Sequence, residues 1–96
     1  MVAVTALLKA KPGQEDALER VLRELARKVR DAEPGCLLYR VARSRHDRQL
    51  YALIERYTDE EALAAHANSE HNRDATPALM ECLEERPDIS LFEELE

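Results

Sequence analysis

The stretch Tyr51-Ala-Leu-Ile-Glu-Arg-Tyr57 runs directly into Thr58-Asp-Glu-Glu-Ala-Leu-Ala-Ala-His66, and this junction is the most informative part of the sequence. The first stretch has apolar or aromatic residues on both alternating faces, which predicts a β-strand that ends at Tyr57. Thr58 and Glu61 then fit a capping box, in which the hydroxyl and the carboxylate each accept a backbone N–H near the start of a helix. An apolar strand that leads directly into a capped helix is therefore expected.

The helix after this junction is expected to carry His66, and Asn68-Ser69 predicts a break followed by a new N-cap. A third helix then has His71 in its first turn, on the side that also holds Ala75 and Cys82. These two imidazoles, at the ends of neighbouring elements, are the main side chains of this small chain that can take part in a reaction. Because a neutral imidazole accepts protons near neutral pH, any reaction is predicted to centre on them.

The segments before the junction supply two more strands and the longest helix. Residues 2–10 alternate with apolar side chains on both faces, and residues 36–44 do the same before a polar turn at 46–48. Residues 36–57 should therefore form an antiparallel hairpin. Apolar residues at three- and four-residue spacing predict one amphipathic helix, which Pro34-Gly35 ends. Its apolar stripe consists of Ala17, Leu18, Val21, Leu22, Leu25, Ala26 and Val29.

A last strand is expected from Ile89 to Leu95, which gives the order βαββααβ. This order predicts one α+β domain over residues 1–96, with a four-stranded antiparallel sheet and helices packed on one face. The helices supply one layer, yet at least two strands are apolar on both faces. A bare apolar face of several hundred Å² is abnormal for a monomer. We therefore expect a homodimer in which two sheets pack face to face.

Charged and aromatic side chains alternate within the predicted hairpin. We expect Arg40 and Glu55 on the face opposite Tyr39 and Tyr51, where they would form an ion pair across the hairpin, with a role in a pocket as the alternative. The tyrosines are expected to fill the sheet faces. Each buried phenol usually finds a hydrogen-bond partner, and it can also orient the hydroxyl group of a ligand.

The composition excludes several classes of function. The formal net charge is -6 and no basic patch is visible, which argues against nucleic-acid binding. No apolar run approaches the roughly 20 residues of a membrane span, and no signal peptide opens the chain, so a cytoplasmic protein is expected. With only Gly13 and Gly35, no glycine-rich phosphate loop can form. Cys36 and Cys82 stand far apart and are expected to be reduced and buried.

Three pieces of the sequence resemble one known family. They are Lys11-Pro-Gly, Glu33-Pro-Gly-Cys-Leu-Leu-Tyr39, and the segment from Glu55 to His71 that contains His66-x-x-Ser-x-His71. As an ordered set they resemble the antibiotic biosynthesis monooxygenase domain family, from Val2 to about Leu95. The resemblance implies a dimeric α/β barrel built from ferredoxin-like protomers. It also implies activities that include the cofactor-independent oxidation of phenols and quinols, as well as haem degradation.

Two departures from the family pattern reduce the number of activities that the resemblance implies for this chain. Tyr57 stands where much of the family ends the strand with Trp. The haem-degrading branch relies on an Asn, Trp and His set, and the matching places here hold Ala6, His66 and Thr76. Haem degradation therefore has no support from the residues, and no cofactor is expected.

The helix pattern and the resemblance together give the candidate site residues. His71 is the predicted catalytic base, because it should face inward beside a partly apolar pocket. The alternative is a histidine that bonds to backbone or caps the neighbouring loop. His66, Asn68, Tyr39 and Tyr57 are the predicted substrate-binding residues, with packing or loop structure as the alternative for each. A His-x4-His pair can hold a metal ion, but no carboxylate pattern or third histidine accompanies it in the sequence, so no metal is predicted.

Three functions remain open at this stage. The first is a cofactor-free monooxygenase, in which His71 removes a proton from a small phenol or quinol and the resulting anion reduces dioxygen in a dry pocket. The second is a non-catalytic, stress-associated or ligand-binding dimer. The third is a non-oxidative enzyme, such as an isomerase or decarboxylase, that uses the same histidine.

Overall fold

The computed structural model describes residues 1–96 and has the element order βαββααβ. The elements are β1 (Val2–Lys9), α1 (Glu15–Ala32), β2 (Cys36–Arg43), β3 (Leu50–Tyr57), α2 (Glu60–Ala67), α3 (Glu70–Cys82) and β4 (Asp88–Glu93). This order confirms the sequence prediction. The last strand ends at Glu93 and does not reach Leu95.

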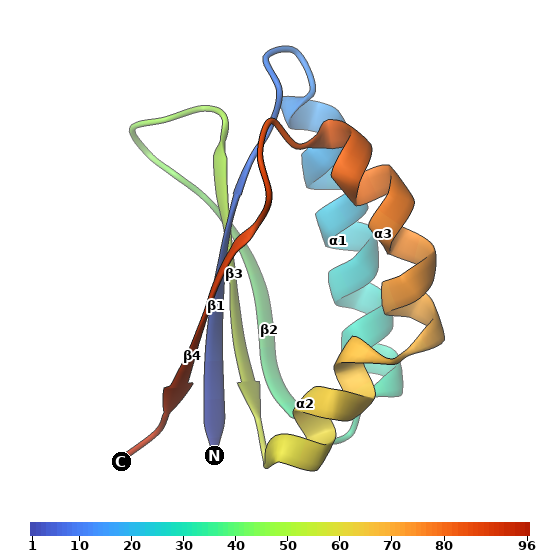
Figure 1. Cartoon of the computed structure of the whole chain (residues 1–96), viewed down its shortest axis with the longest axis vertical. Coiled ribbons are helices and arrows are strands. Elements are labelled where there is room, and N and C mark those ends of the chain that lie inside the picture. The colour runs from blue at the N-terminus through green and yellow to red at the C-terminus, as the bar shows by residue number, and fades with distance from the viewer.

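The four strands form one antiparallel sheet in the order β2-β3-β1-β4, so β1 and β3 are central. The three helices lie on one side of this sheet, and its other side carries none (Figure 1). This is the expected ferredoxin-like α+β arrangement. Directly paired residues point to the same face of a sheet. Val4, for example, pairs with Glu55 in β3 and with Leu91 in β4, so all three share the helix side.

The hydrophobic core lies between α1 and the sheet. Five residues of the predicted apolar stripe are buried, and they pack against helix-facing side chains of β1, β2 and β3. Leu8, Tyr39 and Tyr51 are among the largest fully buried side chains. Burial of one large apolar side chain stabilises the fold by about 1.5–3 kcal/mol. This packing therefore fixes α1, and with it the position of Glu33 at its carboxyl end.

The start of α2 differs from the prediction by one residue. Asp59, and not Thr58, is the N-cap, and its side chain accepts a hydrogen bond from the backbone N–H of Ala62 at 2.8 Å. A Cβ added at Gly35 would lie 2.7 Å from the Cβ of Ala62. Glycine therefore allows the start of β2 to approach α2 closely, which holds Glu33 near the same helix.

The predicted ion pair between Arg40 and Glu55 is wrong. Arg40 is exposed and pairs with Ile54 on the open face of the sheet. Glu55 follows Tyr51 by four residues, and strand side chains alternate between faces, so both point toward the helices. Glu55 is consequently a buried carboxylate with only 5% of its surface exposed.

The helix-free face of the sheet is apolar and exposed. Leu7, Ile54 and Phe92 are 43%, 42% and 54% exposed, and the strand register places all three on this face. Ile89 and Leu91 point to the helix side instead, but they are also exposed because β4 is an edge strand. The open face is the surface on which the sequence predicts that a second copy packs.

Two smaller features concern the cysteines and the helices. Cys36 and Cys82 are free thiols, as expected. Cys82 is buried, whereas Cys36 is only partly buried.

None of the helices combines the length and the apolar composition that crossing a membrane would require.

Candidate active site

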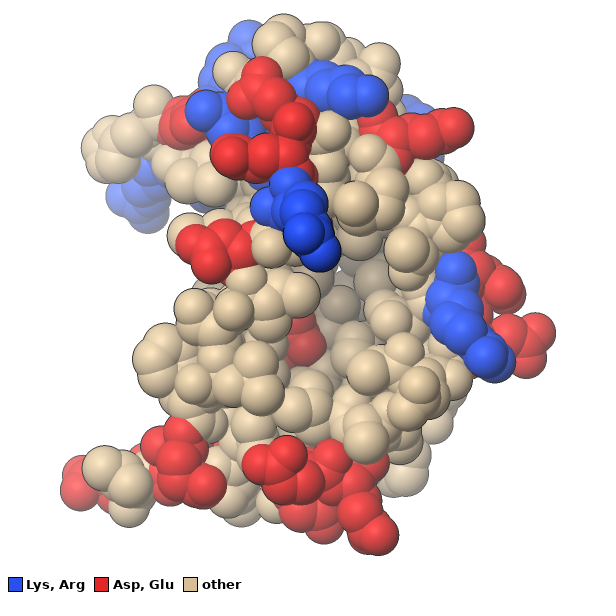
Figure 2. Space-filling model, in the orientation of Figure 1, with Lys and Arg blue, Asp and Glu red and all other residues tan.

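A cavity of about 270 Å³ lies between the sheet and the helices, toward the β4 edge. Figure 2 shows a hollow between these layers, with acidic atoms visible deep inside uncharged surroundings. Eleven of the fifteen lining residues are hydrophobic, and Glu55, His66 and Asn72 supply most of the polar atoms. A mostly apolar cavity with few polar groups is the usual form of a small-molecule site.

Glu55 is the acidic group of the cavity wall, and Tyr57 holds it. The Tyr57 hydroxyl donates to a carboxylate oxygen of Glu55 over 2.6 Å, and both side chains are buried. Burial raises the pKa of Glu55, although the Tyr57 hydrogen bond and the nearby His66 act in the opposite direction. Burial and the Glu55 carboxylate also raise the pKa of Tyr57, so its phenol keeps its proton and continues to donate.

The raised pKa of Glu55 predicts how stability depends on pH. Below the ordinary value of 4.5 the carboxyl group is protonated in the folded and the unfolded chain. As the pH rises through the higher pKa of the folded state, the unfolded chain loses its proton first, so the free energy of unfolding falls. Glu55→Gln does not titrate, and its stability relative to the natural protein should therefore increase with pH across this window. Urea denaturation at pH 4.5 and at mildly alkaline pH checks this, and a difference that does not change with pH would contradict it.

His66 forms part of the cavity wall at the end of α2. Its Nδ1 lies 2.9 Å from Oε2 of Glu33, and its ring centroid lies 5.4 and 5.6 Å from those of Tyr39 and Tyr57. An ionised carboxylate only accepts hydrogen bonds, so Nδ1 carries the proton. The lone pair of the neutral ring is then on Nε2, which has no hydrogen-bond partner within the chain and is not sealed from solvent.

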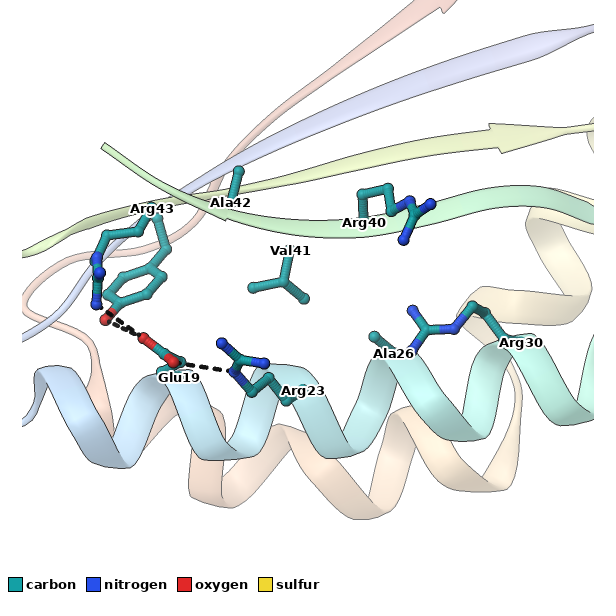
Figure 3. A pocket seen from close by; sticks show the side chains of 9 residues that line it. Glu19, Arg23, Ala26, Arg30, Arg40, Val41, Ala42 and Arg43 are labelled. Atoms are coloured by element: carbon teal, nitrogen blue, oxygen red, sulfur yellow. Dashed lines mark hydrogen bonds and ion pairs between the residues drawn. The ribbon is translucent and has the colours of Figure 1, made fainter. Parts of the chain in front are cut away.

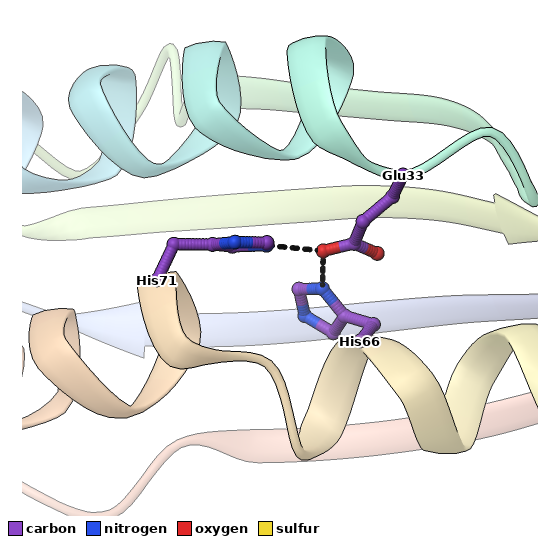
Figure 4. Close-up of side chains that lie close together, drawn as sticks. All are labelled: Glu33, His66 and His71. Carbon is purple, nitrogen blue, oxygen red and sulfur yellow. Dashed lines mark hydrogen bonds and ion pairs between the residues drawn. The ribbon is translucent and has the colours of Figure 1, made fainter.

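Glu33 connects the two histidines predicted from the sequence. It is the C-cap residue of α1, and its Oε2 is shared by Nδ1 of His66 and Nε2 of His71 (Figure 4). Its other oxygen, Oε1, is buried without a hydrogen-bond partner. A carboxylate that accepts from two imidazoles fixes the orientation of both rings and stabilises a positive charge on either one.

His71 lies behind this carboxylate and not in the cavity wall. Ser69 caps α3 as predicted, accepting from the backbone N–H of Asn72 at 3.2 Å, which places His71 in the first helical turn. The predicted approach of the histidines is confirmed, with ring centroids 6.4 Å apart. His71 lines a separate surface groove that Glu33 also lines. It can therefore influence a ligand in the cavity only through Glu33 and His66.

The other predicted binding residues are distributed unequally. Tyr39 lines the cavity, whereas Tyr57 contributes through its hydrogen bond to Glu55. Asn68 is exposed, and its side-chain amide donates to a backbone carbonyl of α2 at 3.0 Å, so it does not reach the cavity. Asn72 lines the cavity instead, and its amide donates to the last carbonyl of α2 at 3.3 Å.

The sequence of this chain matches the family model for antibiotic biosynthesis monooxygenases over residues 1–78. The chain belongs to the antibiotic biosynthesis monooxygenase family. None of the curated proteins matches it.

Solved structures of similar proteins share the fold of this family member. A protein from Caulobacter crescentus, assigned as an antibiotic biosynthesis monooxygenase, is 32% identical with a TM-score of 0.95, covering 99% of this chain and 90% of its own. PA3566 from Pseudomonas aeruginosa is 36% identical with a TM-score of 0.90, covering 99% and 94%. Rv0793 from Mycobacterium tuberculosis is 28% identical with a TM-score of 0.91, covering 99% and 95%.

The sequence prediction for this monooxygenase-family protein missed Glu33 and placed Glu55 on the wrong face of the sheet. The face on which Glu55 lies could have been predicted, because strand residues an even number apart point to the same face. Glu55 is two residues from Tyr57 and four from Tyr51. Glu33 opens the Glu-Pro-Gly piece of the family resemblance, but nothing in its spacing points to histidines 33 and 38 residues away. Only the folded chain brings these groups together.

A second groove, of about 310 Å³, lies between α1 and β2 and is rich in arginine (Figure 3). Glu19 accepts hydrogen bonds from Arg23 at 2.9 Å and from Arg43 at 3.2 Å, and also from the hydroxyl of Tyr51. The Arg23 hydrogen bond lowers the pKa of Glu19, which keeps this carboxylate charged and paired. No imidazole or thiol lines the groove. The candidate active site of this family member is therefore the cavity beside His66.

Proposed function

We propose that this protein is a homodimeric, cytoplasmic monooxygenase that oxidises a small phenol or quinol with dioxygen and needs no cofactor. The observation that carries this proposal is the position of His66. Its Nδ1 is anchored to the partly buried Glu33, its Nε2 has no hydrogen-bond partner within the chain, and the ring forms part of the wall of an apolar cavity. Membership of a family described as monooxygenases supports the class of reaction.

In this proposal His66 takes the role of proton acceptor that the sequence suggested for His71, because His71 does not line the cavity. Nε2 of His66 removes the hydroxyl proton while Nδ1–H remains bonded to Glu33. The Glu33 carboxylate then stabilises the imidazolium, as the carboxylate does in the triads of serine hydrolases. His71 holds the same carboxylate from its other side and acts as a positioning residue.

The reaction balances without a metal or a flavin. Loss of the hydroxyl proton places negative charge on ring carbons that bear hydrogen, opposite the oxygen in a phenol and next to its carbon in a quinol. This anion passes one electron to dioxygen, and recombination of the two radicals at such a carbon forms a carbon–oxygen bond and a peroxide, whose outer oxygen receives the proton held by His66. The outer oxygen then leaves as hydroxide, which combines with the proton lost from that ring carbon to form one water, and a quinone remains. One oxygen atom enters the product, the other leaves as water, and the substrate supplies all four electrons.

The cavity supplies exclusion of water and orientation of the substrate. Its volume of about 270 Å³ is slightly below the range of most ligand sites, which span roughly 300–1,000 Å³, so it suits a small substrate with one or two rings. Apolar walls strengthen the electrostatic interactions of the developing anion. The carboxyl group of Glu55 lies in the wall and is held by the Tyr57 hydroxyl, and Tyr39 forms another part of the wall.

Oxygen uptake with a panel of phenols and quinols tests the proposal. We expect one dioxygen consumed for each quinone formed, and no product under argon. A phenol that binds without any oxygen uptake would favour the non-catalytic ligand-binding dimer. Product formed equally well without dioxygen would favour an isomerase or decarboxylase on the same scaffold.

We also propose that a second copy covers the open face of the sheet. Leu7, Ile54 and Phe92 are exposed there, and a charge placed among them would be buried at the interface. Ile54→Lys is therefore expected to convert a particle of about twice the chain mass into a monomer of 11.0 kDa. Light scattering measures this mass. Met80→Lys is the matched control, since Met80 is similarly exposed at 44% but lies on α3. A natural protein that already has the mass of one chain would contradict the dimer.

A further inference from the structure

Glu33, His66 and His71 form a cluster that their own hydrogen bonds leave incomplete. One ligand atom from each residue lies within 4.8 Å of the other two, and both imidazoles point toward the same carboxylate oxygen of Glu33 (Figure 4). Oε1 of Glu33 is buried and has no hydrogen-bond partner. Leaving a buried acceptor unpaired is unfavourable, and more so when the group is charged. The cluster therefore has unused capacity to coordinate a cation.

The donor set of this cluster is suited to a transition metal. Two imidazole nitrogens and one carboxylate oxygen are a combination that Zn²⁺ uses in three-residue sites, with bond lengths of about 2.0–2.2 Å. Such bonds around a tetrahedral ion place two ligand atoms roughly 3.3 Å apart. Nδ1 of His66 and Oε2 of Glu33 are already 2.9 Å apart. Side-chain rotations that bring the three ligand atoms around one ion would replace the hydrogen bonds by metal–ligand bonds.

A groove of about 450 Å³ gives access to the cluster from the surface. Asp59 and Glu61 line this groove together with Glu33 and His71, and their negative charge favours the entry of a cation. Cys36 lines the groove as well. Burial and the nearby Glu33 raise the pKa of its thiol to about 11, so this thiol is protonated in the metal-free protein.

We propose that Glu33, His66 and His71 bind one divalent transition-metal ion, of which Zn²⁺ is the best match, and that this ion switches off His66 as a proton acceptor. The second part rests on the proposed function. A metal bond to Nδ1 of His66 displaces the proton that Glu33 now accepts. The neutral ring then carries its proton on Nε2, so the nitrogen at the cavity wall becomes a donor. Metal binding and proton removal from a phenol therefore exclude each other.

Calorimetric titration of chelator-treated protein with Zn²⁺ alone tests the site. We expect one ion per chain, and a loss of affinity of at least about 100-fold in Glu33→Gln and in His71→Ala, since even outer residues of metal sites contribute about 10- to 100-fold. His46→Ala is the matched control, because His46 is the remaining histidine of the chain and is exposed. Circular dichroism verifies that each variant is folded, and His71→Ala serves if Glu33→Gln does not fold. No binding, or binding that both cluster variants retain, overturns the site.

Two further readouts test the switch and separate it from the proposed function. Long-range ¹H–¹⁵N spectra should show the proton of His66 on Nδ1 without metal and on Nε2 with Zn²⁺. One equivalent of Zn²⁺ should also abolish oxygen uptake, and a chelator should restore it. If Zn²⁺ binds at the cluster but oxygen uptake continues unchanged, the switch is wrong. The tautomer measurement does not depend on any enzymatic activity, so it can fail or succeed independently of the monooxygenase proposal.

Discussion

His66→Gln should lower kcat/KM for phenol oxidation by about 10²- to 10⁴-fold, the usual contribution of a positioned general base. Glutamine can fill the end of α2 and donate from its amide to Glu33, but it offers no basic nitrogen to the cavity. Substrate binding should change much less than turnover, because the apolar walls remain. Initial rates of oxygen uptake over a range of phenol concentrations give both quantities.

Two histidine variants serve as controls for this prediction. His46→Gln should keep full activity, since His46 is exposed between β2 and β3. His71→Gln should lose activity about 10- to 100-fold, as expected for a residue that positions a partner of the reacting group. If His71→Gln is inactive while His66→Gln retains natural rates, the assignment of the base to His66 is wrong.

Glu33→Gln has the second large expected effect, a fall in kcat of about 10²- to 10⁴-fold with little change in KM. An amide does not stabilise an imidazolium as a carboxylate does, and the corresponding change in a serine-protease triad costs about 10⁴-fold. Glu33 does not line the cavity, so it should leave substrate affinity nearly unchanged. Steady-state kinetics that resolve kcat and KM separately provide the measurement.

Glu24→Gln is the matched control for the Glu33 variant. Glu24 also lies on α1, where it pairs with Arg27 at the surface, and exposed ion pairs of this kind contribute little. Glu33→Asp keeps the charge on a shorter side chain, so its activity should fall between those of the natural protein and Glu33→Gln. A Glu33→Gln variant with a raised KM and a natural kcat would show that Glu33 acts in binding and not in proton transfer.

The fold could be predicted from the sequence because its signals are local. The apolar stripe of α1 identifies the helix and the face that packs on the sheet. Alternation in β1 and β3 identifies strands with two apolar faces. The cap of α2 was misplaced because Thr58 and Asp59 are both good N-caps, and the choice between them depends on how closely Gly35 approaches the helix.

The candidate site could be predicted only in part, for a similar reason. The approach of His66 and His71 follows from one short break between two helices, which is visible in the sequence. The position of Glu33 between them depends on how α1 packs against α3 and on how closely Gly35 approaches α2, and both are long-range contacts. Glu33 lies between the two rings, so that His66 lines the cavity on one side of it and His71 lines the surface groove on the other.

A crystal structure with a slowly reacting phenol, grown without dioxygen, is the most direct test of His66 as the proton acceptor. We expect the phenol to occupy the cavity between the sheet and the helices, with its oxygen about 2.6–3.2 Å from Nε2 of His66, the distance that proton transfer requires. Nδ1 of the same ring should remain bonded to Glu33. A phenol bound in the arginine groove, or one in the cavity whose oxygen points away from His66, would contradict it.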